Sequence, residues 1–183
     1  GAGLEELEGK DEEGYRFRYY ARRDDPQKTP VYFKRKDYPD VIYRTEEAKL
    51  RVIAREIMRD NVMGRPVLVG TTSVEMSERL SARLKAEPLR RLALTLLLRS
   101  TWMEQNNREE DGRQIDELQF LYEPLEKLDT TEMRRLAREL GLSFNAEDAA
   151  NLDKLLRILY LNPENCDRLA KDLAGGVPHE VLN

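Results

Sequence analysis

The clearest helical pattern in the chain begins after Thr45, whose side chain can cap a first helical turn. Apolar residues then recur at positions 0, 3, 4, 7 and 8, the spacing of a single buried helix face. They are Leu50, Ile53, Ala54, Ile57 and Met58. Gly64 and Pro66 follow and are residues that end helices. The pattern therefore predicts one amphipathic helix followed by a turn.

A short apolar run and a polar turn come next. Val67-Leu68-Val69 is typical of a parallel strand that is covered on both faces. Gly70, Thr71, Thr72 and Ser73 form the turn, and Thr72 to Glu75 predicts a capping box for another helix. Earlier in the chain, residues 15–19 alternate aromatic and cationic side chains, which predicts a half-buried strand. Strand, polar turn and helix together indicate one unit of a doubly wound α/β sheet.

Residues 88–174 have a different composition. They contain 20 leucines, while all nine valines lie outside them. Leucine favours helices and valine favours strands. Helix starts are expected near Pro88, Asp129, Asn145 and Asn162, and Gly141 suits a helix end. We therefore expect a small all-helical bundle inserted at 88–174 into an α/β domain formed by 15–87 and 175–183. Residues 1–14 are expected to be a flexible acidic tail, and 177–183 to return to strand.

Composition narrows the possible functions. The chain of 183 residues is 36% charged, yet its formal net charge is only −4. A strongly basic coat for nucleic acid is therefore excluded. Cys166 and His179 are the only cysteine and histidine, so they cannot form a zinc site of Cys and His ligands. No apolar stretch is long enough to cross a bilayer, and we expect a soluble, intracellular protein.

No catalytic, cofactor-binding or metal-binding constellation stands out. The phosphate loop G-x-x-x-x-G-K-S/T is absent, and His179 is expected to be a loop or sheet-edge residue. The polar site with a meaningful position is the Gly70–Ser73 turn, at the carboxyl end of a strand and the start of a helix. Such a turn can bind an anion. It can equally serve only to cap its helix.

The Gly70–Ser73 turn lies within residues 64–78, which have the sequence GRPVLVGTTSVEMSE. This segment matches the pattern G-x-P-V-L-V-G-T-x-S-I/V-E-x-S-E and so resembles the second nucleotide-binding domain of the SecA family of preprotein translocase motors. Two further blocks, RKDYPDVIYRTE at 35–46 and PHEVLN at 178–183, are similar to the flanking family segments. The resemblance covers roughly residues 28–85 and 177–183. In the family the helix after G-T-x-S leads almost directly to the third block, whereas here residues 88–174 intervene, like a much enlarged variable subdomain.

This resemblance implies a fold class and a function. The fold would be a partial RecA-like parallel sheet of the P-loop NTPase type, interrupted by the helical insertion. The intact parent would be an ATPase that uses ATP and Mg to move preproteins. Its partners would be the other nucleotide-binding domain of the same chain, the membrane translocation channel and preproteins, without specific nucleic acid. It would be cytoplasmic and peripherally membrane-associated.

For the segment itself the resemblance implies less. Without a phosphate loop we expect it neither to hydrolyse ATP alone nor to bind a cofactor tightly. Gly70, Thr71, Thr72 and Ser73 would shape a strand–helix junction near the cleft between domains. The insertion would regulate the motor or make contacts, or would simply pack on its host.

Two alternatives remain at this point. One is a fragment of a nucleic-acid helicase, whose strand-binding face would be the basic segment Arg16–Arg35. The other is a non-enzymatic helical interaction module at 88–174. The acidic balance of the chain and the specific SecA-like blocks favour the translocase interpretation over both.

Overall fold

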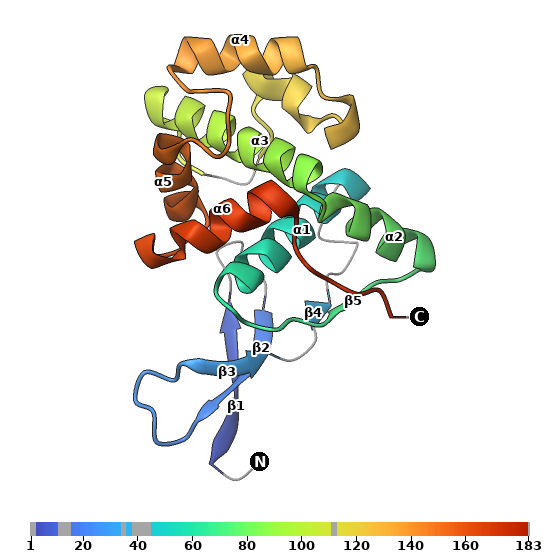
Figure 1. Cartoon of the computed structure of the whole chain (residues 1–183), viewed down its shortest axis with the longest axis vertical. Helices are drawn as coiled ribbons and strands as arrows, with labels where there is room; N and C mark the ends of the chain where they lie inside the picture. Colours follow the sequence, from blue (N-terminus) through green and yellow to red (C-terminus); the bar gives the residue numbers. More distant parts are fainter. Residues whose placement is uncertain (1–2, 11–15, 34–35, 38–44, 111–112, 183) are drawn as a thin grey trace.

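The computed structural model describes residues 3–10, 16–33, 36–37, 45–110 and 113–182. Helices form the larger part of the molecule and the strands lie below them (Figure 1). The strands are β1 (Leu4–Lys10), β2 (Arg16–Arg22), β3 (Pro30–Phe33), β4 (Lys36–Asp37) and β5 (Val69–Gly70). The α-helices are α1 (Glu46–Val62), α2 (Val74–Arg83), α3 (Ala86–Gln105), α4 (Thr130–Leu140), α5 (Ala149–Ile158) and α6 (Cys166–Gly175). The 3-10 helices are η2 (Asp116–Tyr122), η3 (Leu125–Lys127) and η4 (Pro163–Asn165).

Helix α1 confirms the first sequence prediction. The Thr45 hydroxyl accepts a 3.0 Å hydrogen bond from the Ala48 backbone N–H, which satisfies one of the free donors of the first turn. Ile53 and Met58 are fully buried on the predicted face. Gly64, just past the helix, has a φ of 71°, a left-handed conformation that suits glycine.

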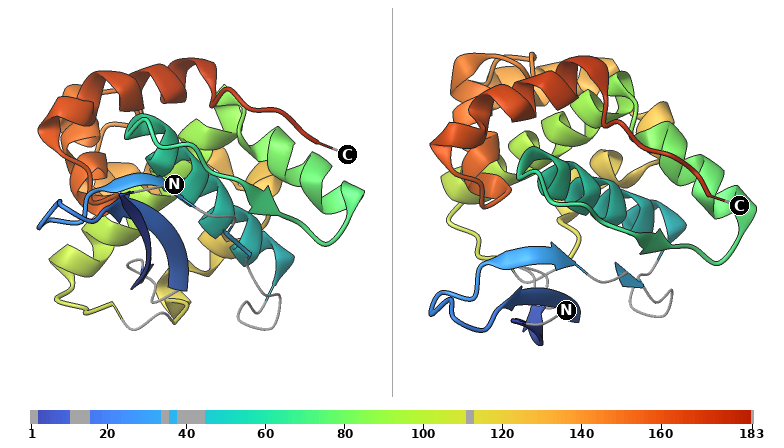
Figure 2. Two further views of the ribbon diagram at one scale, coloured as in Figure 1. Left: turned by 90° about the horizontal axis from the view of Figure 1, so that it is seen from below. Right: turned by 60° about the horizontal axis from the view of Figure 1, so that its bottom comes forward.

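The N-terminal strands form an antiparallel sheet in the order β1-β2-β3, seen from two further directions in Figure 2. The flexible tail expected for residues 1–14 is therefore wrong for 4–10, which pair with β2 along their whole length; 11–14 lie outside the described residues. The physical reason is that β2 supplies a partner strand for the backbone of β1, with facing pairs such as Leu7–Tyr19. Glu5 of β1 also forms an ion pair with Lys28, in the loop between β2 and β3.

β4 and β5 form a second, parallel pair. The predicted strand at 67–69 is only partly confirmed, because β5 begins at Val69, and Leu68 is 55% exposed instead of covered. The strand expected at 177–183 is wrong for the described residues 177–182, which are extended without ladder pairing. Residues 67–68 and 177–182 have a strand-like pattern but no neighbouring strand within the described part of the chain. The fold is thus mixed α and β, with helices predominating.

The helical block follows its predicted punctuation in most places. Asp129 caps α4 through a 3.2 Å bond from the Glu132 N–H, and Gly141 ends that helix with a φ of 76°. Asn162 and Pro163 begin η4, which leads into α6. The cap predicted at Asn145 is wrong, because α5 begins later, with Asp148 at the cap position. Asn145 instead closes the preceding turn through a bond from the Glu147 N–H.

One apolar core joins the host and inserted segments. Buried residues of α1 and α2 belong to the same contact cluster as those of α3, α4, α5 and α6. Its largest fully buried members include Ile53, Met58, Leu89, Leu97, Leu98, Leu155 and Leu169. Among the described helices, none is long and apolar enough to span a membrane. The insertion therefore packs directly on the helices that precede and follow β5.

Candidate functional site

The Gly70–Ser73 turn joins β5 to α2. Ser73 has an extended backbone (φ −157°, ψ 160°), and its hydroxyl accepts a 3.1 Å bond from the Met76 N–H. Ser73 is thus the cap residue, one position after the cap predicted at Thr72. The predicted capping box is wrong, because the residue three positions after Ser73 is Met76, which cannot accept the return bond of a capping box. Thr72 itself is exposed.

Thr71 completes the local hydrogen bonding of this turn. Its hydroxyl donates to the Ser73 carbonyl at 3.2 Å, and its oxygen lies 2.5 Å from the Ser77 hydroxyl, which can donate to it. Three hydroxyl groups of the strand–helix junction are therefore used in folding it. This geometry favours the capping interpretation of Gly70–Ser73 over anion binding.

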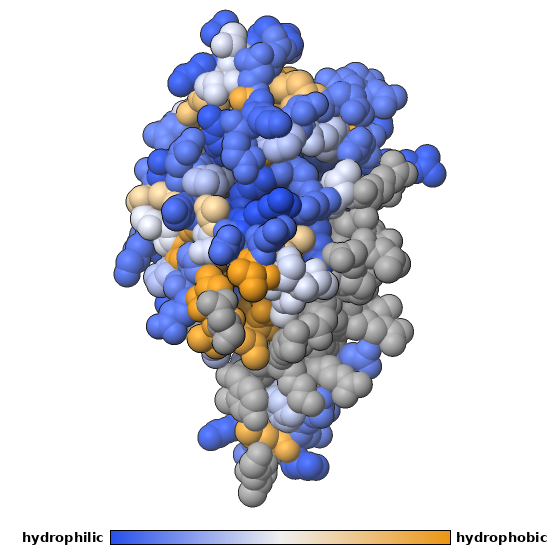
Figure 3. Space-filling view, turned by 90° about the vertical axis from the view of Figure 1, so that its right-hand side faces the viewer, coloured by the Kyte–Doolittle hydropathy of each residue, from blue (hydrophilic) through white to orange (hydrophobic). Residues whose placement is uncertain are grey.

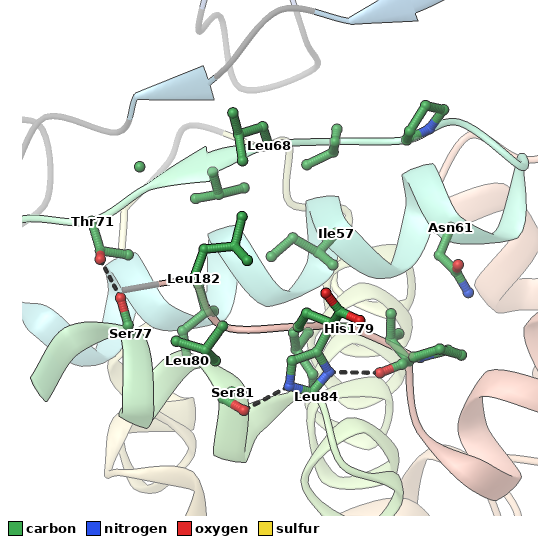
Figure 4. A pocket seen from close by; sticks show the side chains of 18 of the residues that line it. Ile57, Asn61, Leu68, Thr71, Ser77, Leu80, Ser81, Leu84, His179 and Leu182 are labelled. Atoms are coloured by element: carbon green, nitrogen blue, oxygen red, sulfur yellow. Dashed lines mark hydrogen bonds between the residues drawn. The ribbon is translucent and has the colours of Figure 1, made fainter. Parts of the chain in front are cut away.

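A groove of about 520 Å³ opens beside the turn. Its floor comes from α1 and α2, and each side is an extended segment, 65–70 on one side and 177–182 on the other (Figure 4). The floor contains Ile57 and Asn61 of α1, with Ser77, Leu80, Ser81 and Leu84 from α2 and its end. Two chain segments more than a hundred residues apart in sequence thus flank one helical surface.

The sides of the groove carry apolar side chains that face solvent. Leu68 is 55% exposed, Val181 42% and Leu182 77%. Apolar side chains gather on the face of the molecule that carries β5 and the C-terminal segment (Figure 3). A concentration of exposed apolar side chains in a groove is typical of a surface that binds or packs against another segment. The groove is therefore the candidate functional site.

His179 holds the C-terminal side of the groove against α2. Its Nδ1 lies 2.8 Å from the Val177 carbonyl and its Nε2 lies 2.6 Å from the Ser81 hydroxyl (Figure 4). A carbonyl only accepts, so Nδ1 is the donor to Val177; in the tautomer that carries its proton on Nδ1, Nε2 accepts from Ser81. His179 is a loop residue, as predicted, but its contact with Ser81 was not foreseen, because 98 positions separate them.

The Ser81–His179 contact differs from a catalytic Ser–His–Asp triad in the group that orients the imidazole. In a catalytic triad a buried carboxylate orients the imidazole and stabilises its charged form. Here the oriented nitrogen faces the backbone carbonyl of Val177. The arrangement positions residues 177–179, and we assign it no catalytic role.

Arg83 links the insertion to both host helices. Its guanidinium donates to Glu47 of α1, with one N–O distance of 2.8 Å, and lies 3.3 Å from Glu126 of the insertion. Arg51 also donates to Glu47, at 2.7 Å, and to the Leu121 carbonyl, also at 2.7 Å. Burial raises the pKa of Glu47, but the hydrogen bonds from Arg83 and Arg51 outweigh it and hold that pKa below its usual range.

A second link joins α1 to the last inserted helix. Asn61 Nδ2 lies 3.0 and 2.8 Å from the two carboxylate oxygens of Asp172. Burial raises the pKa of Asp172, and the bond from Asn61 and the charges of Arg168 and Lys171 offset only part of that effect. Neither this pair nor Arg83 was identified from the sequence, because amphipathic patterns place residues on a face without naming their partners.

Comparison with known proteins relates part of the chain to a known family. Residues 32–100 match the family model of the SecA P-loop domain. That range includes β5, the Gly70–Ser73 turn and α2, and it ends within α3. No solved structure matches the chain.

Several proteins with similar sequences are SecA subunits of protein translocases. The chain is 58% identical over 60 residues to the one from Synechococcus sp. (strain JA-3-3Ab), covering 33% of this chain and 6% of the relative. It is 67% identical over 51 residues to that of Chloroflexus aggregans, covering 28% and 5%. With SecA of Thermus thermophilus it shares 34% identity over 160 residues, covering 86% of this chain and 14% of the relative. These matches support a SecA-type segment.

The extent of the Thermus match bears on the insertion. Since only 96 residues lie outside 88–174, an alignment that covers 86% of the chain must extend through much of the helical block. At least one SecA therefore contains residues that correspond to it. The chain spans only a small part of each of these relatives, 5% to 14% of their lengths.

Proposed function

We propose that this chain is part of the RecA-like nucleotide-binding domain of a SecA-type translocase, with residues 15–87 and 175–183 as host and 88–174 as insertion. The intact protein would use ATP and Mg to move preproteins through a membrane channel. It would act in the cytoplasm and at the membrane surface. This segment alone would not hydrolyse ATP.

The groove carries this proposal. Its two sides, 65–70 and 177–182, are extended, lie over helices α1 and α2, and expose Leu68 and Leu182. A parallel sheet packs on helices in the same way, with apolar side chains on the buried faces. We propose that a further strand of the intact protein lies between the two segments. Their exposed apolar side chains would then become interior residues of a larger parallel sheet.

The Gly70–Ser73 turn would then lie at the carboxyl end of a central strand. Open α/β sheets bind ligands at that edge. Because its hydroxyl groups bond within the turn, Gly70–Ser73 would shape the cleft between the nucleotide-binding domains without contacting nucleotide. The insertion, anchored by Arg51 and Arg83, would act on the motor through α1 and α2.

Substitution of one groove residue tests this function. In the full-length protein that contains the chain, Leu68→Asp should lower preprotein-stimulated ATPase activity about tenfold or more, because a carboxylate inside a sheet costs several kcal/mol. In the chain alone, the same change should alter the free energy of unfolding by less than about 0.5 kcal/mol, since Leu68 is exposed there. Val74→Asp is the matched control, because Val74 is 60% exposed and lies outside the groove lining.

The outcome separates the candidate functions. Full activity of the Leu68→Asp protein would contradict the buried strand. Tight, salt-sensitive binding of single-stranded RNA by the chain, with no response to preprotein, would favour a helicase instead.

A further inference from the structure

Asp172 occupies an unusual position for a carboxylate. It is 4% exposed, yet the partner that contacts both of its oxygens is the neutral amide of Asn61. The nearby cations Arg168 and Lys171 lie on its own helix, and they reduce the effect of burial on its pKa only in part. A buried carboxylate is costly unless its hydrogen bonds are well made. The Asn61–Asp172 pair therefore fixes the contact between α1 and α6 more strictly than apolar packing would.

The backbone of Asp172 acts at the same place. Its carbonyl accepts a 2.7 Å bond from the Gly176 N–H, which ends α6. Gly176 has a φ of 87°, and a Cβ added there would lie 2.9 Å from the Leu84 carbonyl oxygen. The next residue, Val177, donates a 2.9 Å bond to that same oxygen. Asp172 thus holds α1 with its side chain and directs the chain into the groove side with its backbone.

Asn61 belongs to the groove itself. It lines the groove at one end, and Ile57, one turn earlier on α1, lies in the floor (Figure 4). Segment 65–70, one side of the groove, begins four residues after Asn61. The side formed by 177–182 begins five residues after Asp172. The hydrogen-bonded pair Asn61–Asp172 therefore lies just before the start of both groove sides in the sequence.

We propose that Asn61 and Asp172 are positioning residues that set the separation of the two groove sides. Through this pair the last helix of the insertion determines whether the groove has the width of a strand. That consequence for binding rests on the function proposed above. The separation itself is a property of this chain and can be measured without any partner.

Electron spin resonance distances across the groove test the proposal. Nitroxide labels are attached to Leu68→Cys and Val181→Cys in a Cys166→Ser background; both labelled positions are exposed. Asn61→Asp then places two carboxylates face to face, and the distance distribution should become broader with a longer mean. The double change Asn61→Asp with Asp172→Asn restores a carboxylate–amide pair with its members exchanged. It should recover the original distribution.

Controls separate positioning from general damage. Arg135→Ala removes an exposed ion-paired residue of α4 and should leave the distribution unchanged. Circular dichroism checks that each variant is folded, and Asn61→Ala replaces Asn61→Asp if that variant is not. An unchanged distribution in the folded single variant overturns the proposal, and so does a failure of the exchanged pair to restore it. These distances do not depend on the Leu68→Asp result, so either hypothesis can fail alone.

Discussion

The guanidinium of Arg83 on α2 is hydrogen-bonded to the carboxylate of Glu47 on α1, and both side chains are largely buried, 5% and 14% exposed. Glu126 of the insertion also forms an ion pair with Arg83, at 3.3 Å. Three separate parts of the chain therefore meet at one cation.

Removal of the Arg83 guanidinium should lower the free energy of unfolding. Arg83→Ala leaves Glu47 buried with Arg51 as its remaining partner, and breaking such a buried pair costs about 3 kcal/mol. Urea unfolding of the purified chain measures the loss. Arg135→Ala, which removes two exposed ion pairs on α4, should cost less than about 1 kcal/mol. Equal losses in the two variants would contradict the structural role of Arg83.

Two glycines with positive φ should differ in their tolerance of a side chain. Gly141→Ala meets nothing within 4 Å and should cost only the backbone strain, about 1 kcal/mol. Gly176→Ala adds a contact of 2.9 Å with the Leu84 carbonyl oxygen, and the backbone of Gly176 lies in a region essentially restricted to glycine. Gly176→Ala should therefore lower the free energy of unfolding by about 2 kcal/mol more than Gly141→Ala does. Thermal unfolding of both variants compares them. A smaller loss for Gly176→Ala would show that the junction relaxes.

Cap substitutions distinguish the structure from the sequence pattern. Ser73→Ala should lower the free energy of unfolding by about 1 kcal/mol, because Ser73 satisfies the Met76 N–H. Thr72→Ala should have an effect below about 0.5 kcal/mol, since Thr72 is exposed and is not the cap residue. Chemical denaturation measures both, and the reverse order would restore the capping box predicted at Thr72.

Asp172 should give the chain a pH dependence of definite sign. Its pKa is raised, mainly by burial, so the folded state binds this proton more tightly than the unfolded state. The stability from that proton is fully present below the ordinary pKa of 3.8 and is lost as pH rises through the raised value. Asp172→Asn keeps an acceptor for Asn61 and avoids the buried charge. It should therefore be more stable than the parent at neutral pH.

The advantage of Asp172→Asn should shrink as the pH falls through the raised pKa of Asp172 and below 3.8, because the parent carboxyl then also becomes protonated. The cations that act on Asp172 are Arg168 and Lys171, both on α6. Glu47→Gln is the control of opposite sign. The lowered pKa of Glu47 means that its stability is present above the ordinary value of 4.5 and is lost as pH falls through the lowered one. A constant advantage for Asp172→Asn would contradict the raised pKa.

Local patterns predicted the helices well, because a helix bonds within itself and its apolar face is set by nearby residues. The buried face of α1 and the caps at Thr45 and Asp129 followed directly. Where two adjacent residues could cap, the sequence pattern selected the wrong one. It predicted Thr72, whereas Ser73 is the cap, since the choice depends on the backbone that leads from the preceding strand.

Strands were harder to predict because their partners are distant. The acidic segment 4–10 was expected to be a tail and became β1, because β2 supplies a complementary strand. Conversely, 177–182 has a strand-like composition but lacks a neighbouring strand among the described residues. Of the candidate site, the turn at Gly70–Ser73 was found from the sequence. The groove was not found, because its two sides are host segments that lie before and after the insertion in the sequence.

The bond from the Val177 N–H to the Leu84 carbonyl also bears on engineering. Leu84 lies shortly before the insertion and Val177 shortly after it, and these two residues are in hydrogen-bond contact at 2.9 Å. Closing a loop between such neighbours costs little chain entropy. A tight turn of a few residues could therefore replace everything between them. The same site could accept a foreign domain whose own ends lie close together.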